Sequence, residues 1–311
     1  MAADVTVGLL GLGLMGKALA LRLGDAKHRV VGYDIDAEAH RLATEWGIHV
    51  VASPRGVAEQ ADVLILSLPD SKVVTEVLWG DDRVGEGVRS GAVVLDTTTG
   101  WPADAVANHE RFRERGVLFL DVPIVGSSAE VIAGEAVALV GADATSSDAT
   151  SADATSADAG DSDGVSAAYM PIIRSFAREV FPMGGVGRAS QAKLAVNLVL
   201  GLNRLVLAEG LAFGARAGLD LPTLLAVMKS SGAYSKVMDT KGTRMIDGRF
   251  EPVARLAQHA KDVELIRRLA GDLHLRTPVS DIHAGLLAEL IEKGMGQLDN
   301  AAIIKAYLDQ N

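Results

Sequence analysis

The chain has 311 residues, of which 49% are hydrophobic and 23% are charged, as is usual for a globular protein that buries a large core. No uninterrupted apolar run reaches about 18 residues, and the N-terminus lacks the pattern of a signal peptide. The absence of cysteine excludes disulfides and thiolate chemistry. A net charge of −10 argues against nucleic acid as a partner. We therefore expect a cytoplasmic protein that binds neither a membrane nor nucleic acid.

The first half of the chain alternates short β-branched runs with helical patterns. The expected strands are residues 5–10, 29–33, 62–68, 92–96, 118–122, 136–140 and 179–183. Amphipathic stretches at 17–23 and 37–46 lie between them. Strands that alternate with helices indicate βαβ units and a mostly parallel sheet. We therefore predict an α/β, Rossmann-type domain at residues 1–187.

After Gly187 the apolar residues recur at spacings of three and four, which predicts an all-α domain at residues 188–311. The expected helices are residues 191–217, 221–230, 252–269, 280–293 and 301–308. The boundary between the two patterns falls near residues 184–190. Within the first domain, residues 142–164 repeat Ser, Asp, Ala and Thr without a large apolar side chain, so they predict a flexible insertion.

A glycine-rich string of the form G-x-G-x-x-G follows the first expected strand and opens the first helix. The first glycine permits a tight turn, the second lets the backbone approach a pyrophosphate, and the third allows close packing between helix and strand. The string predicts a dinucleotide site. Its candidate cofactor-binding residues are Gly11, Leu12, Gly13, Leu14, Met15 and Gly16.

Asp34 ends the second expected strand, 18 residues after Gly16. A carboxylate at that place accepts hydrogen bonds from the ribose hydroxyls and repels a 2′-phosphate. Arg41, on the following helix, is too far along the chain to hold such a phosphate. The cofactor is therefore expected to be NAD, with NADP less favoured.

Lys193 and Asn197 are the candidate catalytic pair. We expect Ser190 to cap the long helix, which places Lys193 in the first helical turn, where the helix dipole and partial burial would lower its pKa. Such a lysine can exchange protons with a hydroxyl or carbonyl oxygen near neutral pH. Asn197 lies four residues later on the same face and can bind the same substrate.

The histidines indicate no rival site, and we expect no metal. His28, His49, His109 and His274 lie in segments that we interpret as surface helix ends or loops. His259 and His283 stand alone on helices, where solvated faces explain them better than metal ligation does.

Taken together, these motifs resemble the β-hydroxyacid dehydrogenase family, the group of 3-hydroxyisobutyrate dehydrogenase and tartronate semialdehyde reductase. The resemblance spans nearly the whole chain apart from the insertion. Besides the glycine string it covers Leu68-Pro69, the segment from Asp96 to Pro102, the loop from Asp121 to Ser127, the stretch from Gly187 to Asn197, and the pair Lys261-Asp262.

The resemblance implies a role for each of these segments. Lys193 would be the catalytic proton-transfer residue, and Gly126, Ser127 and Asn197 would bind the substrate. The remaining cofactor contacts would come from Leu68, Pro69, Thr99 and Lys261. The family also implies an active site between the domains and a homodimer or homotetramer formed through the α-domain.

Three positions depart from the family pattern. Val125 replaces a serine that touches the substrate carboxylate, Ala189 replaces a glycine, and Ala254 replaces an aromatic residue of the cleft. The expected reaction is hydride transfer between NAD(P) and a short 3-hydroxy acid or its semialdehyde. The alternatives are reduction of glyoxylate, succinic semialdehyde or tartronate semialdehyde, imine reduction, and a cofactor-binding scaffold without turnover.

Overall fold

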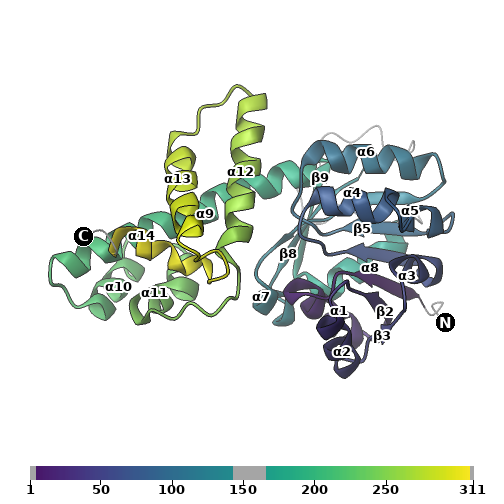
Figure 1. Ribbon diagram of the computed structural model, residues 1–311, viewed down its shortest axis with the longest axis horizontal. Coiled ribbons are helices and arrows are strands. Elements are labelled where there is room, and N and C mark those ends of the chain that lie inside the picture. Colours follow the sequence, from purple (N-terminus) through teal and green to yellow (C-terminus); the bar gives the residue numbers. More distant parts are fainter. Residues whose placement is uncertain (1–4, 143–165, 309–311) are drawn as a thin grey trace. The chain divides into compact units, whose positions relative to one another are not determined.

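The computed structural model describes residues 5–142 and 166–308 (Figure 1). The chain divides into two compact units, Met1–Lys193 and Leu194–Asn311. The predicted insertion at residues 142–164 lies outside the described residues, except for Ala142, whose backbone N–H donates to Gly184 O.

The first unit is built on a nine-stranded sheet in the order β3-β2-β1-β4-β5-β6-β8-β7, with β9 pairing to β8. The strands are β1 Thr6–Leu10, β2 Arg29–Tyr33, β3 His49–Val50, β4 Val63–Leu66, β5 Val93–Asp96, β6 Leu118–Asp121, β7 Ile124–Val125, β8 Val137–Gly141 and β9 Glu179–Gly184. The pairs from β3 to β6 are parallel, while β8 runs antiparallel to β6 and β7. This arrangement confirms the predicted Rossmann-type fold.

Helices cover both faces of this sheet (Figure 1). One face carries α1 Leu14–Asp25, α2 Ala37–Glu45, α7 Ser128–Ile132 and α8 Ser166–Phe176. The other carries α3 Pro54–Gln60, α4 Ser71–Trp79, α5 Val84–Gly87 and α6 Pro102–Arg113. The central strands are therefore covered on both sides, and every residue of β1, β4 and β5 is buried, as in parallel strands of such folds.

The carboxyl ends of the central strands lie side by side. Leu10 at the end of β1 pairs with Leu66 of β4, Leu66 pairs with Asp96 of β5, and Asp96 pairs with Asp121 of β6. The loops that leave these strands therefore start from one edge of the sheet, which is where open α/β sheets bind their ligands.

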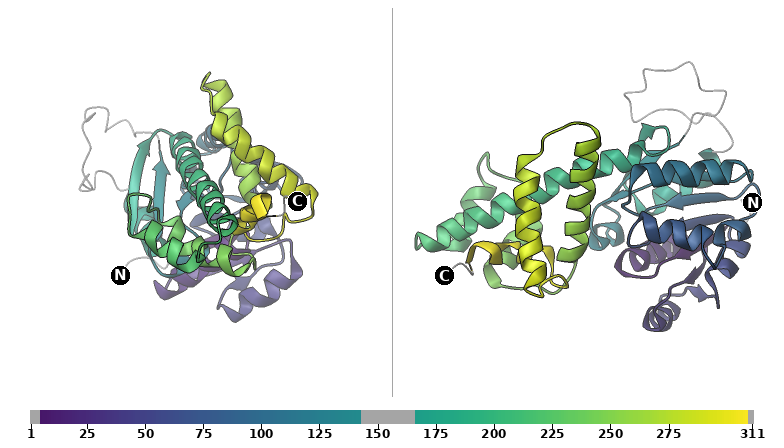
Figure 2. Two further views of the ribbon diagram at one scale, coloured as in Figure 1. Left: turned by 90° about the vertical axis from the view of Figure 1, so that its left-hand side faces the viewer. Right: turned by 45° about the horizontal axis from the view of Figure 1, so that its top comes forward.

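The second unit is helical, as the sequence predicts. Its elements are α9 Arg188–Arg216, α10 Leu221–Lys229, the π-helix η1 Met238–Gly242, α11 Thr243–Asp247, α12 Leu256–Asp272, α13 Pro278–Glu292, the 3₁₀ helix η2 Asn300–Ile304 and α14 Lys305–Leu308. Helices α12 and α13 lie side by side (Figures 1 and 2). The single helix expected at 301–308 is wrong, because a 3₁₀ turn precedes α14. The helix expected at 252–269 begins only at Leu256.

Helix α9 is one continuous helix of 29 residues (Figure 2). It is long and apolar enough to span a membrane by length and composition, with a mean hydropathy of 1.5 over its most apolar window, of which 39% is buried. Part of this apolar character is explained by packing, since Leu205, Leu207 and Leu211 belong to the core of the helical unit. A further set of its apolar side chains is exposed and is considered below.

Candidate active site

The three glycines of the phosphate loop have different surroundings. Gly11 has φ +92°, and a Cβ there would lie 2.2 Å from the Ser67 carbonyl oxygen. A Cβ on Gly16 would lie 2.0 Å from the Gly11 carbonyl oxygen. Around Gly13, in contrast, nothing lies within 4 Å of the Cβ position. Backbone atoms thus leave no room for a side chain at Gly11 or Gly16, whereas the space at Gly13 is open.

Helix α1 begins at this open glycine without a side-chain cap. Gly13 is its N-cap residue, no side chain within the described residues caps it, and its first turn carries no acidic residue. Several other helices of the chain do have capping side chains; these are Asp36, Ser53, Asp70, Ser127 and Asp220. The first N–H groups of α1 therefore remain available to an anion, and with the bare Gly13 they fit the pyrophosphate of a dinucleotide.

Asp34, the residue after β2, lies against the same loop. Its Oδ2 accepts from the Leu12 N–H at 2.6 Å, and its Oδ1 accepts from the Asp36 N–H at 2.9 Å. His40, which the sequence analysis did not consider, accepts from the Asp34 N–H through Nε2 at 3.1 Å. These contacts fix the carboxylate at the end of the strand, and each oxygen keeps a further lone pair for a ribose hydroxyl.

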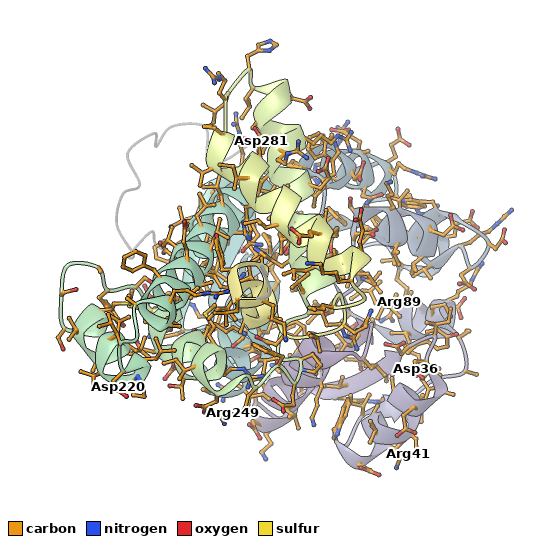
Figure 3. All side chains as sticks on the ribbon, turned by 60° about the vertical axis from the view of Figure 1, so that its left-hand side comes forward. Asp36, Arg41, Arg89, Asp220, Arg249 and Asp281 are labelled. Atoms are coloured by element: carbon orange, nitrogen blue, oxygen red, sulfur yellow. The ribbon has the colours of Figure 1, made fainter. Side chains whose placement is uncertain are left out.

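Arg41 is held away from this carboxylate by its own helix. Its guanidinium pairs with Glu38 at 2.7 Å and Glu45 at 2.8 Å on the exposed surface of α2 (Figure 3). These partners hold the pKa of Arg41 above its usual value. Two carboxylates beside Arg41 oppose the binding of a 2′-phosphate.

The loops after β4 and β5 are tied together beside the glycine loop. The Leu68 N–H donates to Thr98 Oγ1 at 3.1 Å, and the Cβ position of Gly11 lies against Ser67 and Leu68. Thr99 stays partly exposed and Pro69 is exposed. The predicted cofactor residues of this unit thus gather at the carboxyl edge of the sheet.

The loop expected to bind the substrate carboxylate already binds a side-chain carboxylate of the protein. Gly126 has φ +146°, and Ser127 caps α7 in a capping box. The Ser127 N–H donates to Glu130 Oε2 at 2.8 Å, and the Ser127 hydroxyl donates to the same oxygen at 3.1 Å. One of the two backbone donors expected to hold a substrate carboxylate therefore already holds a carboxylate of the chain.

Helix α9 is anchored by Asp121, not by Ser190. The Asp121 carboxylate, 1% exposed, accepts from the Gly187 N–H at 2.9 Å, the Ser190 N–H at 2.7 Å and the Ser190 hydroxyl at 2.9 Å. The expectation that Ser190 is the N-cap is wrong, because α9 begins at Arg188. Lys193 consequently lies in the second turn, where the effect of the helix dipole is weak.

Lys193 and Asn197 lie one turn apart on α9, and both side chains are buried. The Asn197 Nδ2 donates to Asp262 Oδ2 at 3.0 Å, and Lys261 Nζ lies 3.0 Å from Asp262 Oδ1. A carboxylate can only accept, so the Asn197 amide presents its nitrogen to Asp262 and keeps its oxygen as an acceptor for another group. Asp262 thereby links the predicted substrate residue to the predicted cofactor lysine.

Three histidines lie elsewhere than expected. His109, His259 and His283 are 7%, 8% and 2% exposed, so the surface positions predicted for them are wrong. His109 Nδ1 lies 3.1 Å from the Phe119 carbonyl oxygen. The rings of His259 and His283 lie 5.1 Å apart against Gly201, which has no side chain to exclude them. Within the described residues no group of three or more metal-binding side chains occurs.

Two family models match separate parts of the chain. Residues 6–153 match the NAD binding domain of 6-phosphogluconate dehydrogenase, and residues 187–307 match the NAD-binding domain of NADP-dependent 3-hydroxyisobutyrate dehydrogenase. The chain is 26% identical over 300 residues to 2-hydroxy-3-oxopropionate reductase of Escherichia coli, covering 96% of each chain. It is 24% identical over 308 residues to 2-(hydroxymethyl)glutarate dehydrogenase of Eubacterium barkeri, covering 99% of this chain and 96% of that protein.

The fold also matches a solved structure. A 3-hydroxyisobutyrate dehydrogenase from Salmonella typhimurium superposes with a TM-score of 0.84 at 23% identity, covering 97% of this chain and 99% of that chain. The two family matches together cover most of both units, and the relatives align over almost their full length. The chain therefore belongs to the β-hydroxyacid dehydrogenase family, and it is an NAD(P)-dependent dehydrogenase that acts on the CH–OH group of a hydroxy acid.

Proposed function

We propose that this chain interconverts a short 3-hydroxy acid and its semialdehyde, as 3-hydroxyisobutyrate dehydrogenase does, with Lys193 as the proton-transfer residue. The observation that carries the proposal is the buried Lys193, one turn before a buried Asn197 on a helix whose start is held by Asp121. Burial of a lysine costs free energy, and titratable groups that are buried at such a cost cluster at functional sites.

The mechanism assigns a separate task to each side chain. In oxidation Lys193 Nζ takes the proton of the substrate hydroxyl, and it returns that proton to the carbonyl oxygen in reduction. Asn197 orients the substrate through its amide oxygen, since its nitrogen is engaged by Asp262. When bound, the nicotinamide accepts or supplies the hydride. The N–H groups near Gly126 hold the carboxylate, with Ser127 sharing its N–H with Glu130.

The cofactor of this reaction is NAD rather than NADP. The support is the fixed Asp34 carboxylate beside the glycine loop and the neutralised Arg41 on α2. Pro69 and Thr99 would extend the cofactor site towards the nicotinamide half, and Lys261 would close over it.

A reductive role is the second candidate. The relative named 2-hydroxy-3-oxopropionate reductase favours reduction of tartronate semialdehyde or a similar short aldehyde. A scaffold without turnover is opposed by Lys193 and Asn197, both of which the chain has and buries.

The assembly is a homodimer or homotetramer of a cytoplasmic protein. Val199, Val206 and Phe213 recur every seven residues along α9, and they are 57%, 56% and 75% exposed. Residues at this spacing lie on one face of a helix. A second copy of the chain is the partner that would cover this apolar stripe.

One experiment tests the proposal as a whole. Turnover is measured with NAD and NADP against 3-hydroxyisobutyrate, 2-(hydroxymethyl)glutarate, L-threonate and tartronate semialdehyde. We expect NAD-linked turnover of at least one of the 3-hydroxy acids. Turnover with the aldehyde alone would favour the reductive role, and a higher kcat/KM with NADP would show that Asp34 does not select the cofactor.

A further inference from the structure

The hydroxyl of Ser71 connects the two helices that follow β4 and β5. Ser71 is the first residue of α4 and is 6% exposed. Its Oγ accepts from the Trp101 N–H at 2.9 Å and donates to Asp104 Oδ2 at 2.6 Å. Trp101 and Asp104 both belong to the start of α6, which lies beside α4 on the same face of the sheet (Figure 1). One side chain of α4 therefore bridges the first turn of α6.

The first turn of α6 is a capping box with a hydroxyl inserted into it. Trp101 is the N-cap residue, and its indole cannot accept a hydrogen bond as a serine or aspartate side chain does. Asp104 is the third residue of the helix, whose side chain in a capping box accepts directly from the N-cap N–H. Here the Ser71 hydroxyl receives that N–H and passes its own proton to the carboxylate. The start of α6 is therefore capped through a residue of another helix.

Gly100, the residue before this N-cap, lies directly against Ser71. A Cβ at Gly100 would lie 2.6 Å from Ser71 Cβ and 3.1 Å from its Oγ, which is closer than side chains approach each other. The φ angle of Gly100 is not positive, so the close approach and not a special backbone conformation explains the glycine. The missing side chain lets the Trp101 N–H come within hydrogen-bond distance of the hydroxyl.

The other end of this loop is tied to β4. The Thr97 N–H and hydroxyl both donate to the Leu66 carbonyl oxygen, at 2.9 and 2.7 Å. Thr99 follows two residues later and lies between this anchor and the Trp101–Ser71 hydrogen bond. The backbone on both sides of Thr99 is therefore fixed to the segment that ends β4 and begins α4.

We propose that Ser71 is a positioning residue for the nicotinamide half of the cofactor, acting through the loop that carries Thr99. This inference rests on the proposed function, in which Thr99 extends the cofactor site towards the nicotinamide. Without the hydroxyl, the Asp104 carboxylate can accept from the Trp101 N–H directly, so α6 keeps a cap while its start is released from α4. The loop then changes position although the helix stays folded. A small displacement of groups that orient the reactants is enough to slow a reaction.

The test compares measurements that report on the two halves of the cofactor. Ser71→Ala should change the affinity for ADP-ribose, which lacks the nicotinamide, by less than about threefold. It should lower kcat, with the substrate that the wild type turns over, by about 10- to 100-fold. The emission maximum of bound NADH arises from the reduced nicotinamide, and it should shift towards that of free NADH. Calorimetry, steady-state kinetics and fluorescence measure these three quantities.

Two further variants separate positioning from a general loss of stability. Ser53→Ala is the matched control, because Ser53 Oγ also accepts from a backbone N–H, that of Gly56 at 3.1 Å, but within its own helix α3. It should leave kcat and the NADH emission as they are in the wild type. Asp104→Asn keeps an oxygen that can accept from the Ser71 hydroxyl, so it should fall between the wild type and Ser71→Ala.

Two outcomes overturn the proposal. Unchanged kcat and NADH emission in Ser71→Ala, whose folding is verified by its melting temperature, mean that the bridge does not position the nicotinamide. An equal loss of affinity for ADP-ribose and for NADH means that the hydroxyl supports the unit as a whole. Binding of ADP-ribose and emission of NADH need no turnover, so they test the proposal even if no hydroxy acid is a substrate. Turnover by the wild type that Ser71→Ala leaves unaffected refutes the positioning role and leaves the proposed function intact.

Discussion

The two units of this chain satisfy their buried carboxylates with different sets of donors. In the α/β unit, Asp121 and Asp96 are buried beside each other on neighbouring strands, and backbone N–H groups of the unit meet their carboxylates. In the helical unit Asp299 accepts from three backbone N–H groups and also pairs with Lys241, while Asp262 pairs with Lys261. Backbone N–H groups that bind a buried carboxylate are fixed in position by it, and a cation beside the carboxylate balances its charge.

Lys193 on α9 is the last residue of the first unit, and its loss should have the largest effect. Lys193→Ala removes the proton-transfer group and should lower kcat by on the order of 10²–10⁴-fold, with little change in NAD affinity. Steady-state kinetics and NAD titration measure the two effects.

Lys193→Arg is the stricter control, because arginine keeps the charge but does not release a proton at working pH. Substantial activity in that variant would assign electrostatic stabilisation, not proton transfer, to Lys193.

Asp121→Asn should weaken the start of α9. An amide in place of the carboxylate would turn its NH₂ group towards one of the two N–H groups that now donate to Asp121. Two donors cannot bond to each other, so that hydrogen bond would be lost. We expect a loss of about 2–4 kcal/mol in the free energy of unfolding, together with a fall in kcat, since Lys193 follows on the same helix. Urea unfolding and kinetics measure both. A variant of unchanged stability would show that Asp121 does not hold the helix.

Acid should destabilise the chain through its histidine pair. The pKa of His283 falls from 6.5 to about 4 on folding, so the unfolded chain binds this proton first. The contribution of His283 to the free energy of unfolding is therefore complete above about pH 6.5. As the pH falls from there to about pH 4, this contribution declines by about 1.4 kcal/mol per pH unit. The lowered pKa of His259 acts in the same direction. Melting temperatures of the wild type and His283→Gln across this range should diverge in slope, and parallel curves would contradict the assignment.

Glu130→Gln should have the smallest effect. The amide oxygen can still accept from the Ser127 N–H, while the negative charge that competes with a substrate carboxylate is gone. We expect a KM for the hydroxy acid lower by a few-fold, about 1 kcal/mol, with kcat unchanged. An unchanged or higher KM would mean that the substrate carboxylate does not approach Ser127.

The sequence predicted best what depends on neighbours in the chain. The strand Arg29–Tyr33 was expected with its correct bounds, because a β-branched run ends at polar residues that start the next helix. The fold class and the cofactor loop followed from such local patterns. The capping box of Ser127 and Glu130 has an S-x-x-E signal that was also readable from the sequence.

The remaining features depend on contacts between distant positions. Asp121 and Ser190 are 69 residues apart, so a serine before a helix was taken for its cap while the true partner was out of view. The burial of His259 and His283 depends on Gly201, more than 50 residues earlier. Arg204 Nε and Nη1 are buried without a hydrogen-bond partner among the described residues, and no pattern in the helix itself indicates this.

The glycine loop has a consequence for tracing how such proteins diverge. Side chains at Gly11 and Gly16 would collide with the protein's own backbone, so folding alone forbids their replacement. The Cβ position of Gly13 faces open space, so a side chain there would collide only with a bound pyrophosphate. In related proteins that no longer bind a dinucleotide, the fold would still require Gly11 and Gly16, whereas Gly13 could be replaced by other residues. Gly13 is thus the one glycine of the motif whose presence indicates that the ligand is bound. Gly11 and Gly16 indicate only that the proteins share an ancestor.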